Sequence, residues 1–433
     1  MTSQGVRQVC EGCGRELDIL FPGTQCPDCG SLLAIRHPRP SSDGAALRAL
    51  FAARSTSREG LDTSGVWRYR ELVLPDVGSN AVSRPEGNTP LYRSEAVAGW
   101  AGVRGLRLKH EGYNPTGSFK DRGMTVGVTQ AVRVKARAVA CASTGNTSAS
   151  LASYAALAGI PALVFVPSGQ LALGKLAQTL AYGARTLLVR GDFDACMALA
   201  REAGEKLGVY LLNSVNPFRL EGQKTIVLEM LEELGWDPPD WIALPAGNLG
   251  NTSAFGSALL QAREAGLISR LPRLAAIQAE GANPFARGFR EKFARHHRVK
   301  AETLATAIKI GDPASWNRAV RSIRETDGVV TDVTDAEILE AKAAVDASGI
   351  GCEPASAASI AGVRKLVREG TIRSGERVVA VLTGHILKDP GLLLSYHQEM
   401  DPPPSGANRP IQIGASLSEV ERAMGRGSRS GSM

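Results

Sequence analysis

Long apolar runs are missing from this chain, and so are runs of five or more like charges. No apolar segment reaches the roughly 20 residues that a membrane-spanning helix needs, and residues 1–7 (MTSQGVR) contain no apolar signal-peptide core. We therefore expect a cytoplasmic protein without a membrane partner. The net charge of +7 is scattered along the chain, which favours a small anionic substrate over nucleic acid.

Cysteine is scarce and odd in number, with seven among 433 residues, which argues against a disulfide framework. Four of the seven form two Cys-x2-Cys pairs twelve residues apart, namely Cys10, Cys13, Cys26 and Cys29. A glycine follows each pair (Gly14 and Gly30) and permits a tight turn around a metal. Four thiolates at this spacing suit a closed tetrahedral site, so the pattern predicts a structural zinc ribbon over residues 1–36.

Regular alternation of apolar and polar segments is missing from residues 37–84, where we expect a linker or N-terminal arm with a short helix over 44–54. From residue 85 to about 395, apolar runs alternate with helical segments, which predicts an α/β fold with parallel sheets covered on both faces. The expected strands cover 138–142, 162–166, 185–189, 209–212, 241–245, 274–279 and 378–383. Residues 396–433, rich in proline, glycine, serine and arginine, are expected to form a flexible tail.

A lysine, Lys120, follows the turn-forming residues 114–118 (NPTGS) and is expected at the start of a helix. The positive end of the helix dipole and partial burial both lower the pKa of an amine in that position. A neutral amine is the nucleophile that forms a Schiff base with an aldehyde. Because most single lysines are ordinary surface residues, this prediction depends on two further loops.

The first loop, residues 245–253 (PAGNLGNTS), lies between an apolar strand and a helical run. Its glycines let successive backbone N–H groups point into one concavity at a helix N-terminus, which is typical of a phosphate cradle. The loop has neither the Lys-Ser/Thr ending of a nucleotide P-loop nor the Gly-x-Gly-x-x-Gly spacing of a dinucleotide site. It therefore suits a phosphate monoester, with an ordinary glycine-rich turn as the alternative.

The second loop, residues 142–148 (ASTGNTS), offers short hydroxyls for a carboxylate and the Asn146 amide for a ring oxygen. Helix capping alone is the alternative. Thr383 ends another strand, where its hydroxyl can meet a pyridine nitrogen without forcing that nitrogen to stay protonated. An amine, a phosphate cradle and a hydroxyl-rich loop at the carboxyl ends of parallel strands together fit pyridoxal phosphate.

Residues 114–123 (NPTGSFKDRG) resemble the cofactor-lysine motif of fold-type II pyridoxal phosphate enzymes, and specifically of the threonine synthase family. Further matches fall at 142–147, 173–178, 213–224, 247–251 and 353–359, so the resemblance covers about residues 85–395. It implies two open parallel-sheet lobes of the tryptophan synthase β-like kind, with the cofactor between them and a smaller lobe, about 120–214, inserted in the larger one.

The resemblance also implies an activity, the conversion of O-phospho-L-homoserine and water to L-threonine and phosphate by elimination and β-hydration. The implied cofactor residues are Lys120, which binds it covalently, with Asn146, Gly247, Asn248, Leu249, Gly250, Asn251 and Thr383. The implied substrate residues are Ser143, Thr144 and Thr147 for the carboxylate, and Asn213, Ser214 and Arg219 for the phosphate. For Arg219 the alternative is a surface arginine.

One departure from the family pattern is Ile386, which stands where the family usually has glycine. A β-branched residue disfavours positive φ, so the pocket is expected to differ slightly there. Two other functions are considered: an enzyme acting on another phosphorylated amino acid, such as a cysteate synthase-like β-replacement on phosphoserine, and a zinc-ribbon interaction protein with a retired catalytic body. A homodimer is the default expectation.

Overall fold

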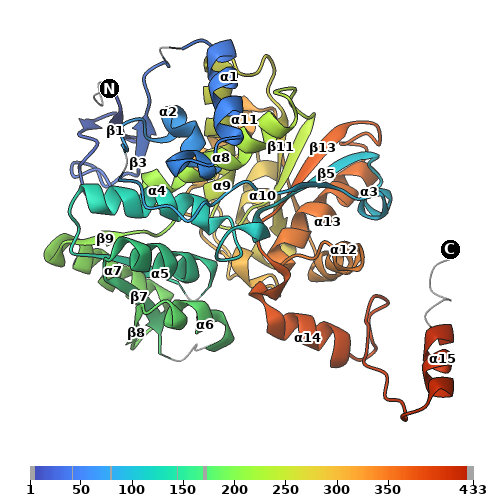
Figure 1. The fold of residues 1–433 in the computed structure, drawn as a ribbon. Helices are drawn as coiled ribbons and strands as arrows, with labels where there is room; N and C mark the ends of the chain where they lie inside the picture. Colours follow the sequence, from blue (N-terminus) through green and yellow to red (C-terminus); the bar gives the residue numbers. More distant parts are fainter. Residues whose placement is uncertain (1–4, 41, 79, 144, 169–172, 427–433) are drawn as a thin grey trace. The chain divides into compact units, whose positions relative to one another are not determined.

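The computed structural model describes residues 5–40, 42–78, 80–143, 145–168 and 173–426 (Figure 1). The chain divides into one unit that ends at Asp389 and a second that begins at Pro390. Among the described residues, no helix has both the length and the apolar character needed to cross a membrane.

The N-terminal ribbon is a small antiparallel sheet of β1 (Arg7–Cys10), β2 (Glu16–Leu17) and β3 (Leu33–Arg36), in the order β2-β1-β3. Gly14 and Gly30 have φ values of 76° and 71°, in the left-handed region that glycine adopts without strain. The amides of these glycines donate to the carbonyls of Cys10 and Cys26, which closes the two turns that the sequence predicts.

The arm over residues 37–84 is packed into the first unit. It contains α1 (Gly44–Ser55), two 3₁₀ helices, η1 (Gly60–Thr63) and η2 (Trp67–Tyr69), and the short α2 (Arg70–Val73). Asp43 caps α1 by accepting a hydrogen bond from the Ala46 amide at 2.8 Å. Trp67 is fully buried, and its indole donates to the Thr125 hydroxyl at 2.7 Å. The arm therefore contributes to the core, which its irregular sequence does not predict.

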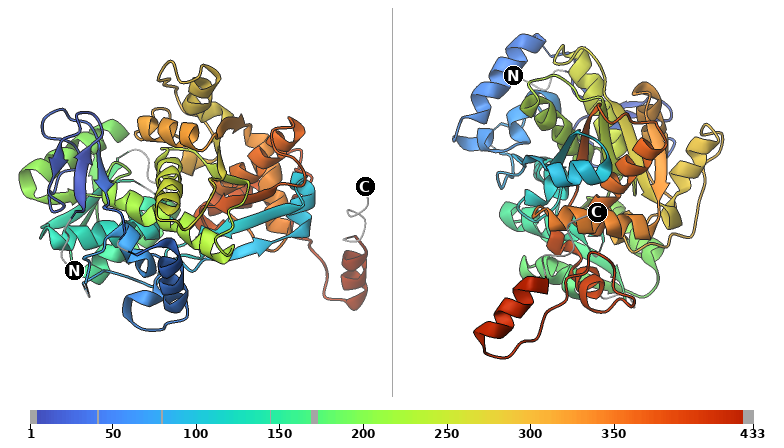
Figure 2. Two further views of the ribbon diagram at one scale, coloured as in Figure 1. Left: turned by 90° about the horizontal axis from the view of Figure 1, so that it is seen from above. Right: turned by 90° about the vertical axis from the view of Figure 1, so that its right-hand side faces the viewer.

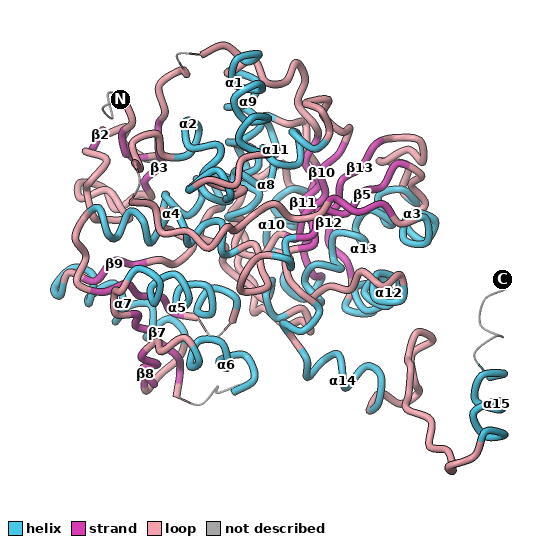
Figure 3. Tube along the Cα trace, viewed as in Figure 1, coloured by secondary structure: helices cyan, strands magenta, loops and turns pink. Residues whose placement is uncertain are grey.

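The larger sheet has the strand order β12-β11-β10-β13-β5-β4, with every pair parallel except β4–β5. Figure 3 labels β5, β10, β11, β12 and β13 of this sheet. Its strands are β4 (Leu91–Arg93), β5 (Gly105–His110), β10 (Trp241–Pro245), β11 (Arg273–Ala279), β12 (Val329–Val333) and β13 (Arg377–Leu382). Successive side chains of β10 enter opposite cores, because Ile242 and Leu244 join one apolar cluster while Trp241 and Ala243 join another.

Helices cover the larger sheet on both faces (Figure 2). One face packs against α8 (Pro217–Glu233), α9 (Gly250–Glu264), α10 (Pro284–Arg290) and α11 (Trp316–Glu325). The other packs against α3 (Glu95–Ala101), α12 (Asp335–Ala347) and α13 (Pro354–Arg368). The remaining 3₁₀ helices of the first unit are η3 (Glu111–Tyr113), η4 (Glu280–Ala282), η5 (Thr306–Ile308) and η6 (Ile386–Lys388).

The smaller sheet is fully parallel, in the order β8-β7-β6-β9. Its strands are β6 (Ala138–Ala142), β7 (Ala162–Pro167), β8 (Arg185–Val189) and β9 (Val209–Leu211), and its helices are α4 (Lys120–Arg133), α5 (Asn146–Ala158), α6 (Leu173–Ala181) and α7 (Phe193–Leu207). Each of these four strands begins and ends within two residues of the position predicted from the sequence. The predicted α/β fold with parallel sheets is confirmed.

The second unit contains α14 (Pro390–Gln398) and α15 (Leu417–Arg426). The residues between these helices have no regular secondary structure. The helix α15 lies inside the segment that the sequence treats as a tail, since a short amphipathic stretch is easily hidden among glycine, proline and serine.

Candidate active site

A pocket of about 340 Å³ opens where strands of both sheets end. Its walls come from the residues that follow β6, β9, β10 and β13, all at the carboxyl ends of parallel strands, where α/β proteins bind their ligands. The predicted residues in its lining are Lys120, Ser143, Asn146, Thr147, Asn213, Ser214, Gly247, Asn248, Leu249, Gly250, Asn251 and Thr383. The predicted Thr144 lies outside the described residues.

Lys120 is the first residue of α4 and lies in the pocket wall. Burial and, to a smaller extent, the positive charge of Arg219 lower the pKa of its amine to about 7, while Glu353 opposes the change. A substantial fraction of the amine is therefore neutral near pH 7. Its Nζ atom lies 4.2 Å from the centroid of the Phe119 ring.

The turn before Lys120 is held by the buried carboxylate of Asp121. This carboxylate accepts hydrogen bonds from the Thr116 amide at 2.7 Å, the Thr116 hydroxyl at 2.6 Å and the Ser150 hydroxyl at 2.6 Å. Burial raises the pKa of Asp121 to about 6. The Phe119 amide donates to the carbonyl of Thr383 at 3.0 Å, so the turn is also tied to the end of β13. The residues on either side of Lys120 are thus tied to α5 and to the end of β13.

The loop after β10 has a strained backbone at Leu249, whose φ of 64° is unusual for a residue with a side chain. A left-handed conformation costs such a residue about 1–2 kcal/mol, and backbone strain of this kind is common at ligand sites. The Asn248 side chain fixes the loop by donating to the Ser214 hydroxyl at 2.6 Å and accepting from the Ala314 amide at 2.6 Å. The first N–H groups of α9, which begins at Gly250, have no partner within the helix.

Two side-chain oxygens at the start of α9 are buried and lack hydrogen-bond partners within the described part of the chain. They are Oδ1 of Asn251 and Oγ1 of Thr252. Buried polar atoms normally have a partner, so an unpaired one beside a pocket points to a bound ligand. The sequence predicts Asn251 as a cofactor residue. It does not predict Thr252, which looks like an ordinary helical residue in the sequence.

Arg219, in the first turn of α8, is only 1% exposed, which excludes a surface arginine. Its Nη1 donates to the carbonyl of Leu212 at 3.1 Å. Its Nε and Nη2 find no acceptor among the residues that the structure describes. Burial lowers the pKa of this guanidinium to about 10, so it still carries its charge at neutral pH. A buried cation with two unused donors is suited to an anion.

The amide of Asn213 is used inside the protein. It accepts from the Ala142 amide at 3.0 Å and donates to the Ala142 carbonyl at 3.0 Å, so it braces the end of β6 against the residues after β9. One N–H of the amide remains for a ligand. Ser143, which follows Ala142, accepts a hydrogen bond from the Gly145 amide at 3.3 Å and shapes the turn before α5.

On the opposite side of the pocket, Glu353 joins two of the predicted cofactor residues. Its Oε2 accepts from Asn146 Nδ2 at 2.9 Å, and its Oε1 accepts from the Thr383 hydroxyl at 2.9 Å. Burial raises the pKa of Glu353, while these two hydrogen bonds oppose the rise. The sequence placed Glu353 in a family-like motif without a role, because a Glu-Pro pair at a helix start does not reveal where the carboxylate points.

Ile386, the departure from the family pattern, is accommodated without strain. It begins the 3₁₀ helix η6, whose backbone has negative φ, so no glycine is required there. Its side chain packs over Gly351, where an added Cβ would come within 3.0 Å of Ile386. In the same helix, Lys388 reaches the pocket and donates to Gln178 Oε1 at 2.5 Å.

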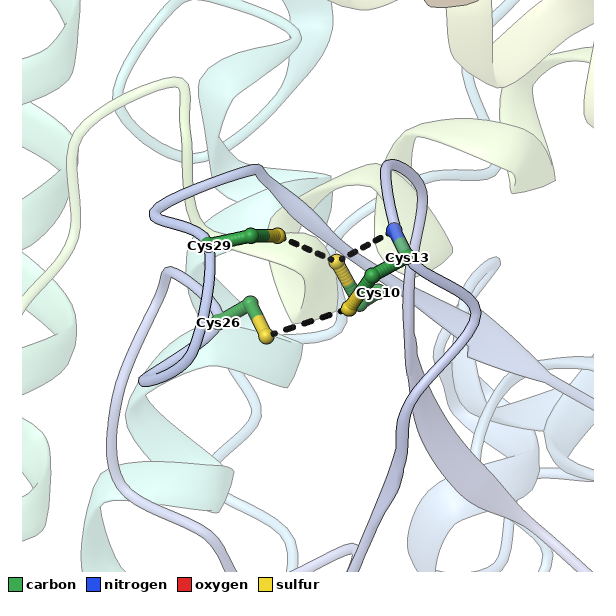
Figure 4. Close-up of side chains that lie close together, drawn as sticks. All are labelled: Cys10, Cys13, Cys26 and Cys29. Carbon is green, nitrogen blue, oxygen red and sulfur yellow. Dashed lines mark hydrogen bonds between the residues drawn. The ribbon is translucent and has the colours of Figure 1, made fainter.

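The four N-terminal cysteines form a second cluster, shown in Figure 4, with all their sulfur atoms within 4.8 Å of one another. The Sγ atoms of Cys10 and Cys29 are 3.3 Å apart, and those of Cys13 and Cys26 are 3.7 Å apart. Zinc–sulfur bonds of about 2.3 Å in a tetrahedron imply sulfur–sulfur distances of about 3.8 Å. The geometry therefore suits a metal. Arg318 of α11 ties the ribbon to the core by donating to the Leu33 carbonyl at 2.5 Å.

The pocket fits pyridoxal phosphate on two observations. Lys120 has an amine of lowered pKa that is suited to an aldehyde. The start of α9 offers N–H groups that have no partner within the helix and the Thr252 hydroxyl, which has no partner among the described residues; both can donate hydrogen bonds to a phosphate group.

Comparisons with known proteins agree with this chemistry. Residues 82–384 match the family model described as pyridoxal-phosphate dependent enzyme. The threonine synthase of Methanocaldococcus jannaschii is 42% identical over 419 residues, which are 96% of this chain and 99% of that protein. The threonine synthase of Methanosarcina acetivorans is 49% identical over 397 residues, which are 90% of this chain and 94% of that protein.

Solved structures show the same fold at lower sequence identity. Threonine synthase from Escherichia coli superimposes with a TM-score of 0.70 at 17% identity, covering 96% of this chain and 94% of that one. Maize serine racemase gives a TM-score of 0.62 at 20% identity, covering 78% of this chain and 97% of that one. At these identities the likeness concerns the fold alone.

Proposed function

We propose a reaction for this chain on the premise that it belongs to the family of pyridoxal-phosphate-dependent enzymes and, within that family, to the threonine synthases. The reaction converts O-phospho-L-homoserine and water to L-threonine and phosphate. The observation that carries the proposal is a lysine with a pKa of about 7 near a buried arginine, two of whose donors have no acceptor among the described residues. The first suits the cofactor, and the second suits a phosphorylated substrate.

The cofactor residues have separate tasks. Bound pyridoxal phosphate supplies an aldehyde for an amino group and a ring that delocalises negative charge from the α-carbon. Lys120 would hold the aldehyde end, and the backbone of residues 247–251 would hold the phosphate. Asn146 and Thr383 would contact the ring. Asn248 acts through the loop, since its amide is already bonded to Ser214 and to the Ala314 backbone.

Lys120 is also the proton carrier in this proposal. Its neutral amine accepts the α-proton of the substrate, and the resulting ammonium returns a proton as the reaction proceeds. A pKa of about 7 lets the same group accept and donate protons at neutral pH. The turn tied to Asp121 and to the Thr383 carbonyl keeps the amine at a fixed position in the wall.

Arg219 and Ser214 would bind the substrate phosphate, with the remaining N–H of Asn213 as a third donor. Nε and Nη2 of this guanidinium have no acceptor in the part of the chain that the structure describes, so they can donate in parallel to two phosphate oxygens. The released phosphate has a second pKa near 6, so when held in the pocket it can also move a proton. Ser143, Thr144 and Thr147 would bind the substrate carboxylate at the start of α5.

Three further proposals concern the whole chain. The four cysteines hold a zinc ion, a proposal supported by their sulfur geometry, and its role is structural because four sulfur ligands leave no open position in a tetrahedral site. The chain forms a homodimer and works in the cytoplasm; both remain predictions, made from general tendency and from the sequence.

The test is a product assay on the purified protein loaded with pyridoxal phosphate. With O-phospho-L-homoserine, phosphate and threonine are expected in equal amounts. Release of phosphate without threonine would contradict the hydration step. A matched assay with phosphoserine and sulfite tests the alternative substrate, and faster turnover there would replace the proposed substrate.

A further inference from the structure

Gln223 is a buried polar side chain in the pocket wall that has no role in the site described so far. It lies on α8, one helical turn after Arg219, so the two side chains share a face of this helix. Gln223 is 3% exposed and belongs to the lining of the pocket. Its Oε1 has no hydrogen-bond partner among the described residues. A buried amide oxygen without a partner at a pocket wall points to a ligand that binds there.

The place of Gln223 is fixed by the close packing of α8 against α4. A Cβ added at Gly222 would lie 1.7 Å from the carbonyl oxygen of Arg122, so only glycine lets the two helices approach this closely. The amide of Gln223 reaches from α4 to the start of α9. A Cβ added at Gly123 would lie 3.2 Å from its Nε2, and one added at Gly250 would lie 3.5 Å from its Oε1. Gln223 is therefore held between the helix of the reactive lysine and the helix proposed to hold the cofactor phosphate.

The first two turns of α8 contain both unpaired and paired polar side chains. Arg219 and Gln223 are unpaired, with two donors and one acceptor that lack partners among the described residues. Glu221 and Lys224, which line a different cavity, pair with each other at 2.5 Å, and Lys224 also donates to the Leu72 carbonyl at 2.9 Å. The same stretch of helix thus satisfies its polar groups on one side and leaves them unpaired on the other.

The groups around the amide of Gln223 favour a phosphate. The first N–H groups of α9 have no partner within the helix, and the Thr252 hydroxyl has none in the described part of the chain, so both can donate to one anion. Oε1 of Gln223 is an acceptor, but a half turn of the terminal amide exchanges it with the NH₂ group in nearly the same space. An anion at the start of α9 repels the oxygen and attracts the NH₂ group, so it selects the donating orientation.

We propose that Gln223 is a ligand of the cofactor phosphate, to which its NH₂ group donates a hydrogen bond. The inference rests on the proposed cofactor site and adds a side chain from α8 to the backbone loop of residues 247–251. The cofactor phosphate is favoured over the substrate phosphate because Gln223 approaches Gly250, the first residue of α9. The helix α8 would then contact both phosphate groups, the cofactor's through Gln223 and the substrate's through Arg219.

The experiment compares the dissociation constants of pyridoxal phosphate and of pyridoxal, which has the same aldehyde and ring without the phosphate group. Absorbance titration of the full-length protein stripped of cofactor measures both. Gln223→Met keeps the length of the side chain and removes the amide. It is expected to weaken binding of pyridoxal phosphate by about tenfold to a hundredfold and to leave binding of pyridoxal unchanged. Gln223→Glu keeps an oxygen acceptor and removes both N–H donors, so it is expected to weaken binding of pyridoxal phosphate at least as much.

Gln130→Met is the matched control, because Gln130 is a buried glutamine whose amide is paired at both ends. It lies on α4, donates to the Ile19 carbonyl at 2.8 Å and accepts from Arg133 Nη1 at 3.1 Å. This variant is expected to lower the thermal stability of the protein and to keep the wild-type ratio of the two dissociation constants.

Three results would overturn the role of Gln223 and leave the proposed function intact. One is an unchanged preference for pyridoxal phosphate in Gln223→Met or in Gln223→Glu. Another is equal weakening of both ligands in Gln223→Met, which would indicate a packing role. The third is a raised KM for O-phospho-L-homoserine in Gln223→Met with cofactor binding unchanged, which would assign the amide to the substrate phosphate. A wild-type protein that binds pyridoxal as tightly as pyridoxal phosphate would instead refute the proposed cofactor site.

Discussion

The two sides of the pocket differ in how far their polar groups are already paired inside the protein. On the ring side, Asn146, Thr383 and Glu353 are joined by hydrogen bonds of 2.9 Å. On the anion side, as judged from the described residues, Arg219 has two donors without a partner and Thr252 at the start of α9 has an unpaired hydroxyl. Glu353 and Thr383 on the ring side are as buried as Arg219 and Thr252 on the anion side, so the difference does not come from exposure to water.

The difference shows what each side contributes. A paired group is held in place by its protein partner, so the ring side is arranged before any ligand binds. An unpaired buried group costs about 1–3 kcal/mol of stability, which a bound anion recovers. The anion side is therefore expected to trade stability of the ligand-free protein for affinity.

The largest effect is expected for Lys120, which lies between the two sides. Lys120→Ala removes the covalent link to the cofactor and the proton carrier together, so kcat should fall by about a thousandfold or more. The visible absorbance of the lysine-bound cofactor should disappear. Spectra of the dialysed, cofactor-loaded protein check this result, and a retained band would refute the assignment of Lys120.

The next effect compares two buried arginines. Arg219→Met should lower kcat/KM for O-phospho-L-homoserine by about a hundredfold, because two charge-assisted bonds to the substrate phosphate are lost. The ligand-free protein should keep its free energy of unfolding or gain slightly, since a buried charge with two unused donors has been removed. Urea denaturation and steady-state kinetics measure the two quantities.

Arg122 provides the matched control for that comparison. Its guanidinium is fully buried and donates to Glu111 at 2.7 and 2.8 Å and to Glu229 at 2.7 Å. Arg122→Met leaves two buried carboxylates short of a partner and should cost about 3–5 kcal/mol of stability. Equal losses of stability in the two variants would show that Arg219 is a structural residue like Arg122.

A third prediction concerns pH. The neutral amine of Lys120 is the reactive form, so the rate of cofactor capture by the ligand-free protein should rise with pH and level off above about pH 7. Below that midpoint the rate should fall by about tenfold per pH unit. In Arg219→Met the midpoint should move upward, because the charge of Arg219 lowers the pKa of Lys120. Stopped-flow absorbance gives the rates, and a wild-type midpoint near pH 10 would contradict the lowered pKa.

The smallest effect compares an unpaired threonine with a paired one. Thr252→Val removes a hydroxyl without a partner in the described part of the chain, so it should weaken cofactor binding by about fivefold and leave the ligand-free protein as stable as before. Thr129→Val should do the reverse, because Thr129 Oγ1 accepts from the Val82 amide at 2.9 Å and donates to the Thr125 carbonyl at 2.6 Å. Cofactor titration and thermal unfolding distinguish the two outcomes.

The sequence predicts the parts of this molecule that depend on local patterns. Strands such as β6 and β10 are short apolar runs bounded by turn residues, and the loops after them contain the glycine, asparagine and hydroxyl residues that bind phosphate and carboxylate. Lys120 at the start of α4 is predicted in the same way, because the turn-forming residues 114–118 precede it. The parallel α/β fold follows from the regular alternation of these strands with helices.

Features that depend on contacts between distant residues could not be predicted. Glu353 and Asn146 are 207 positions apart in the chain, and their hydrogen bond exists only because α13 packs beside the pocket. Trp67 in the arm is buried against distant residues, and its indole N–H bonds to the hydroxyl of Thr125, on another helix. Sequence also suggested Asn213 as a substrate ligand, and only the fold shows that most of its amide is bonded to Ala142.

The central claim is that Lys120 holds pyridoxal phosphate in the pocket between the two sheets. Borohydride reduction of the cofactor-loaded protein, followed by proteolysis and mass spectrometry, tests this claim most directly. The account predicts one phosphopyridoxyl group per chain, on the peptide that contains Lys120. Attachment to another lysine, or no attachment at all, would contradict it.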